Sequence, residues 1–338
     1  MVGRGERSQA LILLTHTDEA RGLYYGDRAL SGLRDLGPVR LNKTGRPLEG
    51  EALIRAAEGA CIIVADRAVP APAALFAALP NLVAFVRGAV DIRTVDVAAA
   101  SAAGVLVTHA SPGFVDAVCE LILGLTIDMC RSVSASVAEH RAGRRPLVQI
   151  GRQIAGSTVG IIGYGAIGRR LAQVMQALGA TVLAADPHAS MDRNGITLLS
   201  LTDLLGRAEI VVCMAVANAA TENLLDEAAL GCMRRGALLI NASRGELVDE
   251  AALARALDSG QLGGAALDVG RGSDQMPTLA LAARPDVVAT PHIGGLTRPA
   301  VEHQAVETVQ QVQAILAGQV PLGSVNAGHW RNATLATR

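Results

Sequence analysis

The sequence predicts an α/β protein built from two doubly wound domains, each with a parallel sheet, and three observations lead to this fold class. Short apolar runs alternate with helical patterns along most of the 338 residues. Most of these runs are apolar throughout, which is typical of strands buried on both faces of a parallel sheet. A long helical stretch at 114–133 and a polar segment at 140–157 interrupt the series. Because a chain of this length exceeds one ordinary core, we expect two domains.

The expected strands fall into a group before the interruption and a group after it. The first group comprises 10–16, 60–66, 82–88 and 105–110. The second group comprises 158–163, 180–186, 209–214, 237–243, 263–269 and 286–293. Helical patterns connect the strands, as at 166–179 and 249–260, and this alternation is typical of doubly wound sheets. A last helical pattern at 298–318 could return to the first domain.

The charge balance and composition argue against nucleic acid and membranes as partners. The chain has 30 basic and 31 acidic residues, and aromatic residues make up 2% of it, so neither a basic footprint nor a stacking surface for bases is expected. No run of about 18 uncharged apolar residues suggests a membrane span, and the N-terminus has only a short apolar run. Five widely spaced cysteines lack metal-ligand spacing. We therefore expect a cytoplasmic protein with no metal site.

One basic segment, HRAGRRPLVQIGR at 140–152, departs from the otherwise balanced charge. It falls in the polar segment that connects the two groups of strands. We expect a solvated linker or a subunit contact there, and a site for a phosphate or an acidic substrate is the alternative.

A glycine-rich turn lies near the start of the second group. Gly163, Gly165 and Gly168 have G-x-G-x-x-G spacing between an apolar strand and a helical pattern. The first glycine permits a tight turn, the second lets the backbone approach a pyrophosphate, and the third lets helix and strand pack closely. The helix N-terminus offers free N–H groups to the phosphates. The turn therefore predicts a dinucleotide site, and the alternative is a glycine turn without a nucleotide.

An acidic residue follows at the end of the next strand. Asp186 lies 18 residues after Gly168, at the end of ATVLAAD. A carboxylate at this place can accept both ribose hydroxyls and would repel a 2′-phosphate. The cofactor expected from this pair of features is NAD and not NADP.

Three polar residues lie at or just beyond the ends of three later strands: Arg244, Asp268 and His292. Because the carboxyl ends of parallel strands face one crevice, we expect these residues to converge beside the cofactor. An arginine can hold a carboxylate and polarise a neighbouring carbonyl, and a histidine can donate or remove the alkoxide proton. The set predicts hydride transfer at a carbonyl, although each residue taken alone could be structural.

The motifs TVGIIGYGAIGRRLA, LLINASRGELVDEAAL, GGAALDV and VVATPHIGG, in this order, resemble the D-2-hydroxyacid dehydrogenases. The resemblance runs from about residue 50 to residue 325, and SRGELVDE and TPHIGG are specific to that family. It implies two Rossmann-like domains. A flavodoxin-like substrate domain would comprise 1–107 and 302–338, and an NAD-binding Rossmann domain would occupy 108–301. The resemblance also implies a homodimer and a cleft that closes on binding.

The resemblance assigns roles to individual residues. Arg244 matches the arginine that binds the substrate carbonyl and carboxylate, His292 matches the catalytic acid/base, and Asp268 matches the carboxylate that contacts the nicotinamide amide. The loop Arg87, Gly88 and Ala89 matches backbone that holds the substrate carboxylate, and the Arg87 side chain could bind a second anionic group or form a structural salt bridge. The residues expected to contact the cofactor are Gly163, Tyr164, Gly165, Ala166, Ile167, Gly168, Asp186, Ala215, Ala242 and Asp268.

The sequence departs from the family in two places. The family usually has a glutamate five residues after the aspartate of LDV, paired with the histidine; here that position is Ser273, and Asp274 follows. One extra residue in the loop would bring Asp274 into the place of the glutamate as partner of His292. The alternative is a histidine with no acidic partner or with one from elsewhere. The cofactor loop CMAVANAATENLL at 213–225 also lacks the family's proline-rich sequence.

These features lead to a main functional hypothesis and two alternatives. The main hypothesis is an NAD-dependent oxidoreductase that interconverts a D-2-hydroxy acid and a 2-keto acid. The first alternative is an NAD(H)-binding regulatory or scaffolding protein with little turnover, which the altered loops would favour. The second is an enzyme of the same family that oxidises formate or phosphite. The identity of the hydroxy acid does not follow from the sequence.

Overall fold

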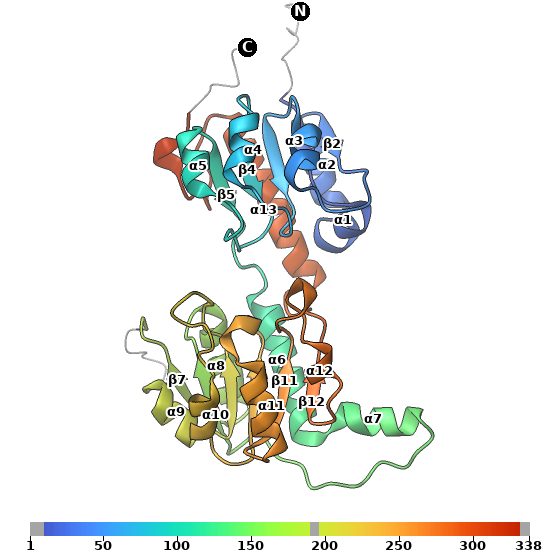
Figure 1. Ribbon diagram of the computed structural model, residues 1–338, viewed down its shortest axis with the longest axis vertical. Coiled ribbons are helices and arrows are strands. Elements are labelled where there is room, and N and C mark those ends of the chain that lie inside the picture. Colours follow the sequence, from blue (N-terminus) through green and yellow to red (C-terminus); the bar gives the residue numbers. More distant parts are fainter. Residues whose placement is uncertain (1–9, 190–195, 332–338) are drawn as a thin grey trace, which may run out of the picture. The chain divides into compact units, whose positions relative to one another are not determined.

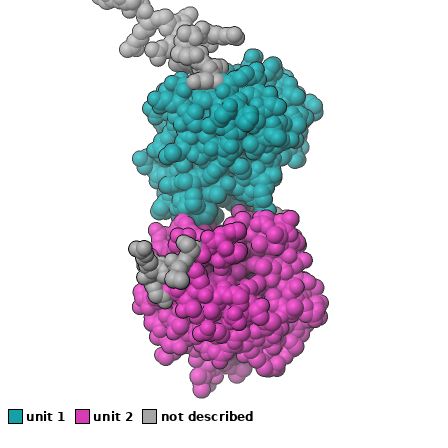
Figure 2. Space-filling view, turned by 90° about the vertical axis from the view of Figure 1, so that its left-hand side faces the viewer, with its two compact units in different colours: residues 1–114, 296–338 teal, residues 115–295 magenta. Residues whose placement is uncertain are grey.

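The structure is a computed structural model that describes residues 10–189 and 196–331, with the side chain of Asp274 outside the described part. Two compact units emerge from the contacts (Figure 2): unit 1 contains the described residues up to Phe114 and those from Leu296 onward, and unit 2 contains Val115 to Gly295. The expected domain boundaries at 107/108 and 301/302 lie a few residues from these. They would divide a strand and a helix that each pack as a whole in unit 1.

Unit 1 is built on a five-stranded parallel sheet in the order β2-β1-β3-β4-β5. Its strands are β1 (Ile12–Leu14), β2 (Val39–Leu41), β3 (Ile62–Ala65), β4 (Ala84–Arg87) and β5 (Leu106–His109). β1, β3 and β4 are buried along their whole length, as their continuous apolar sequences predict. The sequence did not indicate β2, because this edge strand is only partly buried and reads VRL.

Helices cover both faces of the unit 1 sheet. They are α1 (Asp18–Tyr24), α2 (Asp27–Leu36), α3 (Gly50–Ala57), α4 (Ala73–Ala78), α5 (Val97–Ala102), α13 (Arg298–Leu316) and the 3₁₀ turn η3 (Ala327–His329). In β1, Ile12 and Leu14 face the core under α2 and α13, while Leu13 faces the core under α3, α4 and α5. This two-residue period is what a strand between two helical layers requires.

Unit 2 is built on a seven-stranded parallel sheet in the order β12-β11-β10-β9-β6-β7-β8. Its strands are β6 (Thr158–Ile162), β7 (Thr181–Ala185), β8 (Thr197–Leu198), β9 (Ile210–Cys213), β10 (Ala237–Asn241), β11 (Leu262–Leu267) and β12 (Val287–Ala289). The strand order reverses between β6 and β9, and a ligand crevice forms at such a switch point of a doubly wound sheet. The predicted fold class, two parallel-sheet α/β domains, is confirmed.

The helices of unit 2 form two layers, with α6 and α8 on one face of the sheet and α9, α10 and α11 on the other (Figure 1). The helices are α6 (Val115–Arg131), α7 (Val133–Arg141), α8 (Ala166–Ala177), α9 (Leu201–Arg207), α10 (Glu227–Cys232), α11 (Glu250–Asp258) and α12 (Leu279–Ala282), with 3₁₀ turns η1 (Gly245–Leu247) and η2 (Ser273–Gln275). One hydrophobic core of unit 2 lies beneath the α9–α11 layer.

The single helical stretch expected at 114–133 breaks at Ser132, which adopts a left-handed φ of 51°. α7 then extends away from the rest of unit 2 (Figure 1). Among the described residues, no helix is by itself long and apolar enough to cross a membrane. α6 and α7 reach that length and composition only when taken together across a bend of 69°.

Candidate active site

The glycine turn joins β6 to α8, and each of its three glycines meets a different steric condition. Gly163 has a φ of 93°, and a Cβ there would lie 2.5 Å from the carbonyl oxygen of Met214. A Cβ on Gly168 would lie 2.3 Å from the carbonyl oxygen of Gly163, so the helix can approach the turn only without a side chain. A Cβ on Gly165 would meet no atom within 4 Å. Gly165 therefore borders open space, where a pyrophosphate could approach the backbone.

The start of α8 lacks the side-chain cap that three later helices have. α9, α11 and α13 each begin with a side-chain cap, from Ser200, Asp249 and Thr297. The N-cap of α8 is Gly165, which has no side chain to cap the first N–H groups. These donors and the positive end of the helix dipole suit an anion. The turn thus fits the phosphates of a dinucleotide.

Asp186 follows β7 and is bonded to the glycine turn. Its Oδ2 accepts the N–H of Tyr164 at 2.7 Å, and its Oδ1 accepts the N–H of His188 at 2.8 Å. Partial burial raises the pKa of Asp186, but hydrogen bonds from these N–H groups outweigh it and hold the pKa below its usual value. The carboxylate is therefore ionised at neutral pH, and it keeps acceptor sites for ribose hydroxyls.

The other residues expected to contact the cofactor differ in exposure. Gly165 and Ala166 are exposed at the turn, and Ile167 is partly buried. Tyr164 is 3% exposed, and the Arg169 guanidinium lies over its ring, so its side chain belongs to the protein interior. Ala215 and Ala242 are partly buried beyond β9 and β10, and the Ser243 hydroxyl donates to the Ala215 carbonyl at 2.7 Å.

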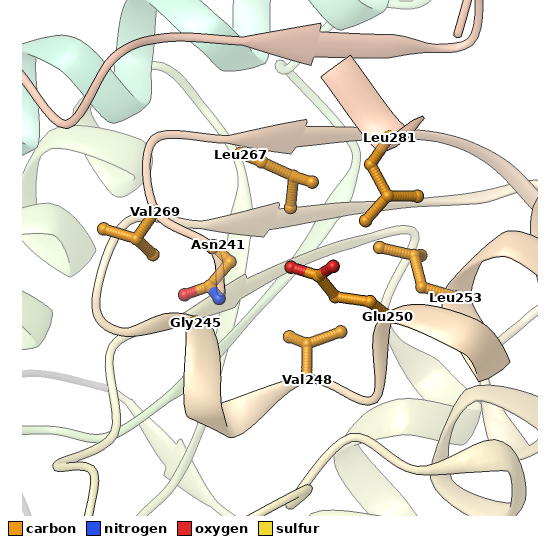
Figure 3. Close-up of a pocket in the computed structure, with 9 residues that line it drawn as sticks. Asn241, Gly245, Val248, Glu250, Leu253, Leu267, Val269 and Leu281 are labelled. Carbon is orange, nitrogen blue, oxygen red and sulfur yellow. The ribbon is translucent and has the colours of Figure 1, made fainter. Parts of the chain in front are cut away.

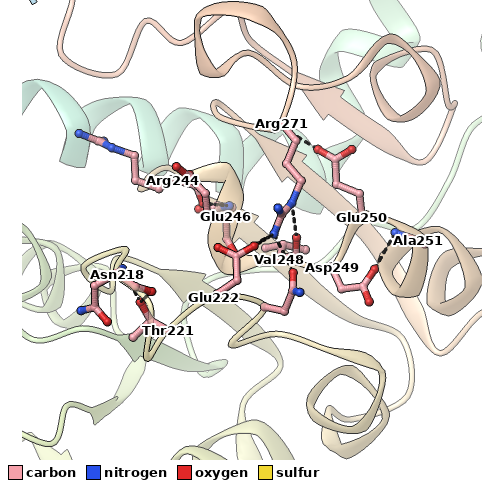
Figure 4. A network of polar contacts seen from close by, with 12 residues as sticks. Asn218, Thr221, Glu222, Arg244, Glu246, Val248, Asp249, Glu250, Ala251 and Arg271 are labelled. Carbon is pink, nitrogen blue, oxygen red and sulfur yellow. Dashed lines mark hydrogen bonds and ion pairs between the residues drawn. The ribbon is translucent and has the colours of Figure 1, made fainter. Parts of the chain in front are cut away.

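Arg244 lies in a tight turn after β10. The side-chain amide of Asn241 donates to the Arg244 carbonyl at 2.9 Å, and the Asn241 amide oxygen accepts the N–H of Ser243 at 3.1 Å. Arg244 then begins η1 with extended backbone, and its Nη1 donates to the Ser243 carbonyl at 2.8 Å. Figure 4 shows its side chain directed away from Arg271, which lies on the other side of the turn.

His292 lies in a turn after β12 that Asp268 holds from the end of β11. The Asp268 carboxylate accepts the hydroxyl of Thr290 at 2.6 Å and the N–H groups of Ile293 and Gly294 at 2.9 and 2.8 Å. Asp268 is 1% exposed, whereas His292 is only partly buried and has a φ of 55°. Few non-glycine residues adopt such a φ, so the turn depends on its hydrogen bonds.

The segments that carry the three predicted residues lie at the carboxyl ends of neighbouring strands of the unit 2 sheet. β10, β11 and β12 are neighbours in the sheet, and their chains leave it at the same end. Backbone bonds continue the ladder beyond the strands, from the Asp268 N–H to Asn241 and from the Thr290 N–H to Leu267. The structure thus brings together the segments that carry Arg244, Asp268 and His292.

The backbone of Asp274 lies in η2, and its side chain lies outside the described residues. The loop that contains it is closed by bonds from the N–H of Gly270 to Gln275 and from the N–H of Gly272 to Met276, at 2.8 and 2.9 Å. The pairing of Asp274 with His292 therefore stays a prediction. Among the described residues, no group of three or more His, Cys, Asp or Glu side chains could hold a metal ion.

In unit 1, the Arg87 side chain is engaged by its own domain. Arg87 is fully buried, and its guanidinium donates to the carbonyls of Asp66 and Val69 and to the hydroxyl of Thr94. Burial lowers its pKa to about 10, against the opposing effect of nearby Asp66, so it stays charged at neutral pH. These contacts hold the domain together. They favour a structural role for the Arg87 side chain over binding of a second anionic group.

The neighbouring loop residues are also bonded within unit 1. The N–H of Gly88 donates to Ala65 at 2.9 Å and thereby extends the pairing of β4 with β3, and Ala89 accepts the N–H of Ala110 at 3.1 Å. In this conformation the Gly88 N–H is used by the sheet. The expected role of this loop in binding a carboxylate stays a prediction.

A cavity that sequence reasoning missed lies in unit 1, at the carboxyl ends of β1 and β3. Its volume is about 290 Å³. Thr15, Thr17, Asp66 and Val69 line it from the loops after these strands. The unit 1 strand order reverses between β1 and β3, which is where doubly wound sheets form crevices. The sequence showed no motif there, because the wall comes from separate loops.

A family comparison bears directly on unit 2. The sequence model of the "D-isomer specific 2-hydroxyacid dehydrogenase, NAD binding domain" matches residues 123–294, a range that includes the glycine turn, Asp186, Arg244 and His292. The chain belongs to this family. As a 2-hydroxyacid dehydrogenase family member, it carries the family's NAD-binding domain in unit 2, so the predicted family and nicotinamide cofactor are confirmed.

Individual proteins and a solved structure are similar to this chain over most of its length. The D-3-phosphoglycerate dehydrogenase of Mycobacterium bovis is 37% identical over 286 residues, which are 82% of this chain and 53% of that protein. The glycerate dehydrogenase of Methylorubrum extorquens is 32% identical over 284 residues, covering 80% of this chain and 87% of that protein. A Thermus thermophilus crystal structure matches with a TM-score of 0.83 and 31% identity, over 93% of this chain and 99% of that one. The chain spans about half the length of the phosphoglycerate dehydrogenases.

Proposed function

We propose that the protein is an NAD-dependent oxidoreductase that interconverts a D-2-hydroxy acid and a 2-keto acid. One observation carries the proposal: the segments bearing Arg244 and His292 follow β10 and β12, the two neighbours of β11, in the sheet that also carries the dinucleotide turn. Unit 2 would serve as the cofactor domain and unit 1 as the substrate domain. The open space at Gly165 and the uncapped start of α8 support binding of the pyrophosphate. The ionised Asp186 supports NAD over NADP.

The chemistry divides between the cofactor and two side chains. When bound, NAD(H) supplies or accepts the hydride at the carbon that bears the hydroxyl. The Arg244 guanidinium binds the substrate carboxylate and polarises the neighbouring carbonyl, as the fixed fork of an arginine allows. The His292 imidazole donates a proton to the carbonyl oxygen in reduction and removes it in oxidation. Asp268 keeps the His292 turn in place and can contact the nicotinamide amide with a remaining lone pair.

Asp274 is proposed as the acidic partner of His292, in place of the family glutamate. A carboxylate there would favour the protonated imidazole and orient its ring. The Arg87, Gly88 and Ala89 loop is proposed to bind the substrate carboxylate. Because Nη1 and Nη2 of Arg87 and the Gly88 N–H already donate within unit 1, and the Arg87 Nε is buried without a partner among the described residues, this would require the remaining N–H groups of the loop or a change in its hydrogen bonds.

We propose that the protein forms a homodimer through α7 and the segment that follows it. In that segment Leu147, Val148 and Ile150 are 83%, 95% and 103% exposed. Such a run of bare aliphatic side chains is typical of a surface that another chain covers. The exposed Val133 and Val137 of α7 continue it. This supports the subunit contact considered for the basic segment at 140–152.

A reducing, cytoplasmic compartment is proposed from the cysteines. All five are free thiols, and burial raises the pKa of Cys119 to about 11 and that of Cys213 to about 12. Thiols of this kind are protonated at neutral pH and behave as small core residues.

The function is tested by measuring NADH and NADPH oxidation with a panel of 2-keto acids. The panel contains glyoxylate, hydroxypyruvate, pyruvate, phenylpyruvate and oxaloacetate. It also contains the keto acid corresponding to 3-phosphoglycerate. One relative is named D-3-phosphoglycerate dehydrogenase and another is named glycerate dehydrogenase, so a phosphorylated substrate is included beside hydroxypyruvate. We expect turnover with at least one keto acid and a preference for NADH. Binding of NADH without any turnover would contradict the proposal and favour a regulatory protein.

A further inference from the structure

The loop after β11 contains an arginine whose side chain bridges two other loops of unit 2. Arg271 Nη2 donates to the Glu222 carboxylate at 2.8 Å, to the Asn223 side-chain oxygen at 2.7 Å and to the Glu246 carbonyl at 2.9 Å. Its Nε donates to the Val248 carbonyl at 3.3 Å. Figure 4 shows the guanidinium close to Glu222, Glu246 and Val248. One planar group thus contacts both loops.

The acceptors belong to segments that carry the proposed cofactor and substrate contacts. Glu222 and Asn223 lie in the loop between β9 and α10, which also contains Ala215. The other two acceptors are the backbone carbonyls of Glu246 and Val248, two and four residues after Arg244. The same loops are joined by a backbone bond from the N–H of Asn223 to Glu246 at 2.8 Å. Arg271 therefore reinforces the junction next to the turn on which Arg244 is built.

The backbone of the Arg271 loop is also fixed against the same turn. The N–H of Arg271 donates to the Glu250 carboxylate at 2.9 Å, and the Thr278 hydroxyl donates to its other oxygen at 2.9 Å. A Cβ on Gly245 would lie 2.2 Å from the carbonyl of Gly270, so turn and loop touch backbone to backbone. Displacing the loop would therefore displace the residue that follows Arg244.

Little empty space remains behind this contact. The cavity that Glu250 borders has a volume of about 10 Å³, room for about one water molecule. Figure 3 shows the Glu250 carboxylate among the side chains of Val248, Leu253 and Leu281. A close-packed neighbourhood transmits a displacement instead of absorbing it.

We propose that Arg271 is a positioning residue that holds the Arg244 turn in the geometry needed to bind the substrate carboxylate. The proposal rests on the function proposed for Arg244. Arg271 donates to carbonyls on the η1 side, while the Arg244 side chain points away from it, so it acts through the backbone and not on the substrate. Its side chain is 35% exposed and its ion pair with Glu222 is accessible to water, so its contribution to global stability is small. Placement of a substrate-binding group within a fraction of an ångström has a larger effect on turnover.

The test is a double-mutant cycle on kcat/KM for the best keto acid of the panel. Arg271→Met keeps the aliphatic stem and removes the donors, and we expect a loss of about tenfold to a hundredfold in kcat/KM, mainly through KM for the keto acid. Arg271→Lys should not restore it, because one ammonium cannot reach both loops as the guanidinium does. In an Arg244→Lys background, Arg271→Met should cost less than about threefold, because the two residues act as a unit.

The control is Arg255→Met, which removes an exposed ion pair with Glu227 at 2.9 Å on the same helix layer and should leave kcat/KM unchanged. Equal losses from Arg271→Met in the wild-type and Arg244→Lys backgrounds would overturn the proposal, as would unchanged kcat/KM in both Arg271 variants. If Arg271→Met does not fold, Arg271→Lys provides the same cycle. A near-normal Arg244→Lys enzyme, or a wild type without turnover, would instead refute the function proposed for the site and remove the basis of the Arg271 role with it.

Discussion

The Asp268 carboxylate accepts the backbone N–H of Gly294 at 2.8 Å, and these two residues enclose the turn that carries His292. A Cβ on Gly294 would lie 2.9 Å from the same carboxylate oxygen, so a larger residue there would displace the carboxylate. The family resemblance assigns Asp268 to the cofactor. The hydrogen bonds of Asp268 also hold the backbone of His292, the proposed acid/base, in a conformation with a φ of 55°.

Replacing Asp268 by asparagine should therefore weaken the His292 turn. The amide keeps one acceptor oxygen and turns an NH₂ group toward a donor, which leaves a buried N–H or hydroxyl without a partner. We expect a loss of about 1–3 kcal/mol in the free energy of unfolding, and a lower kcat. Urea unfolding and keto-acid reduction measure both effects. Asp258→Asn, which removes an exposed partner of Arg284, is the matched control and should change neither.

Two glycine substitutions should separate folding from cofactor binding. Gly168→Ala places a Cβ 2.3 Å from the Gly163 carbonyl oxygen and should lower the melting temperature and NADH affinity together. Gly165→Ala meets no protein atom within 4 Å, so the protein should fold normally while the added methyl obstructs the pyrophosphate. Thermal unfolding and NADH fluorescence titration test this pair. Normal NADH binding by Gly165→Ala would contradict the proposed phosphate site.

His16 should make the stability of unit 1 depend on pH. Burial lowers its pKa to about 4, against the opposing effect of Asp66 at 3.5 Å. The unfolded chain binds a proton near pH 6.5, before the folded protein does. The contribution of neutral His16 to the free energy of unfolding is complete above that pH. It is lost as the pH falls toward 4, which lowers the free energy of unfolding by about 3 kcal/mol.

The comparison that checks this is urea unfolding between pH 7 and pH 5 for the wild type and for His16→Phe. The variant cannot titrate, so its free energy of unfolding should fall less steeply with pH. His140→Asn changes an exposed histidine of α7 and should retain the wild-type slope. Identical slopes in all three proteins would argue against a neutral buried His16.

Arg87→Met should act on stability and not selectively on substrate affinity. It removes donors from the buried carbonyls of Asp66 and Val69, and each unsatisfied group costs about 1–3 kcal/mol. We expect a marked fall in the unfolding midpoint of unit 1 in urea. A variant of normal stability with a raised KM would show instead that the guanidinium binds substrate.

His292→Asn and Asp274→Asn test the proton-transfer step. His292→Asn should lower kcat by about a hundredfold or more, with NADH affinity retained. Asp274→Asn should shift the upper limb of the pH–rate profile to lower pH, because a protonated imidazole would lose its anionic neighbour. An unchanged profile would exclude the pairing of Asp274 with His292.

Local patterns in the sequence were sufficient for much of the fold and of the cofactor site. Continuous apolar runs predicted β3, β4 and most strands of unit 2, because burial on both faces leaves that signature. The glycine spacing and Asp186 predicted the dinucleotide turn, because steric limits act between residues close in sequence. The edge strand β2 was not predicted, because a half-exposed strand has no continuous apolar run.

The sequence by itself determined the α/β class, the family, the glycine turn and the residues at the strand ends. Only the tertiary structure decided what those residues contact. Asp268 holds the His292 turn 24 residues away, Arg87 is bonded within its own domain, and Arg271 joins two loops that begin on other strands. The physical reason is that hydrogen bonds between loops depend on how far each chain runs beyond its strand. No spacing within one segment encodes that distance.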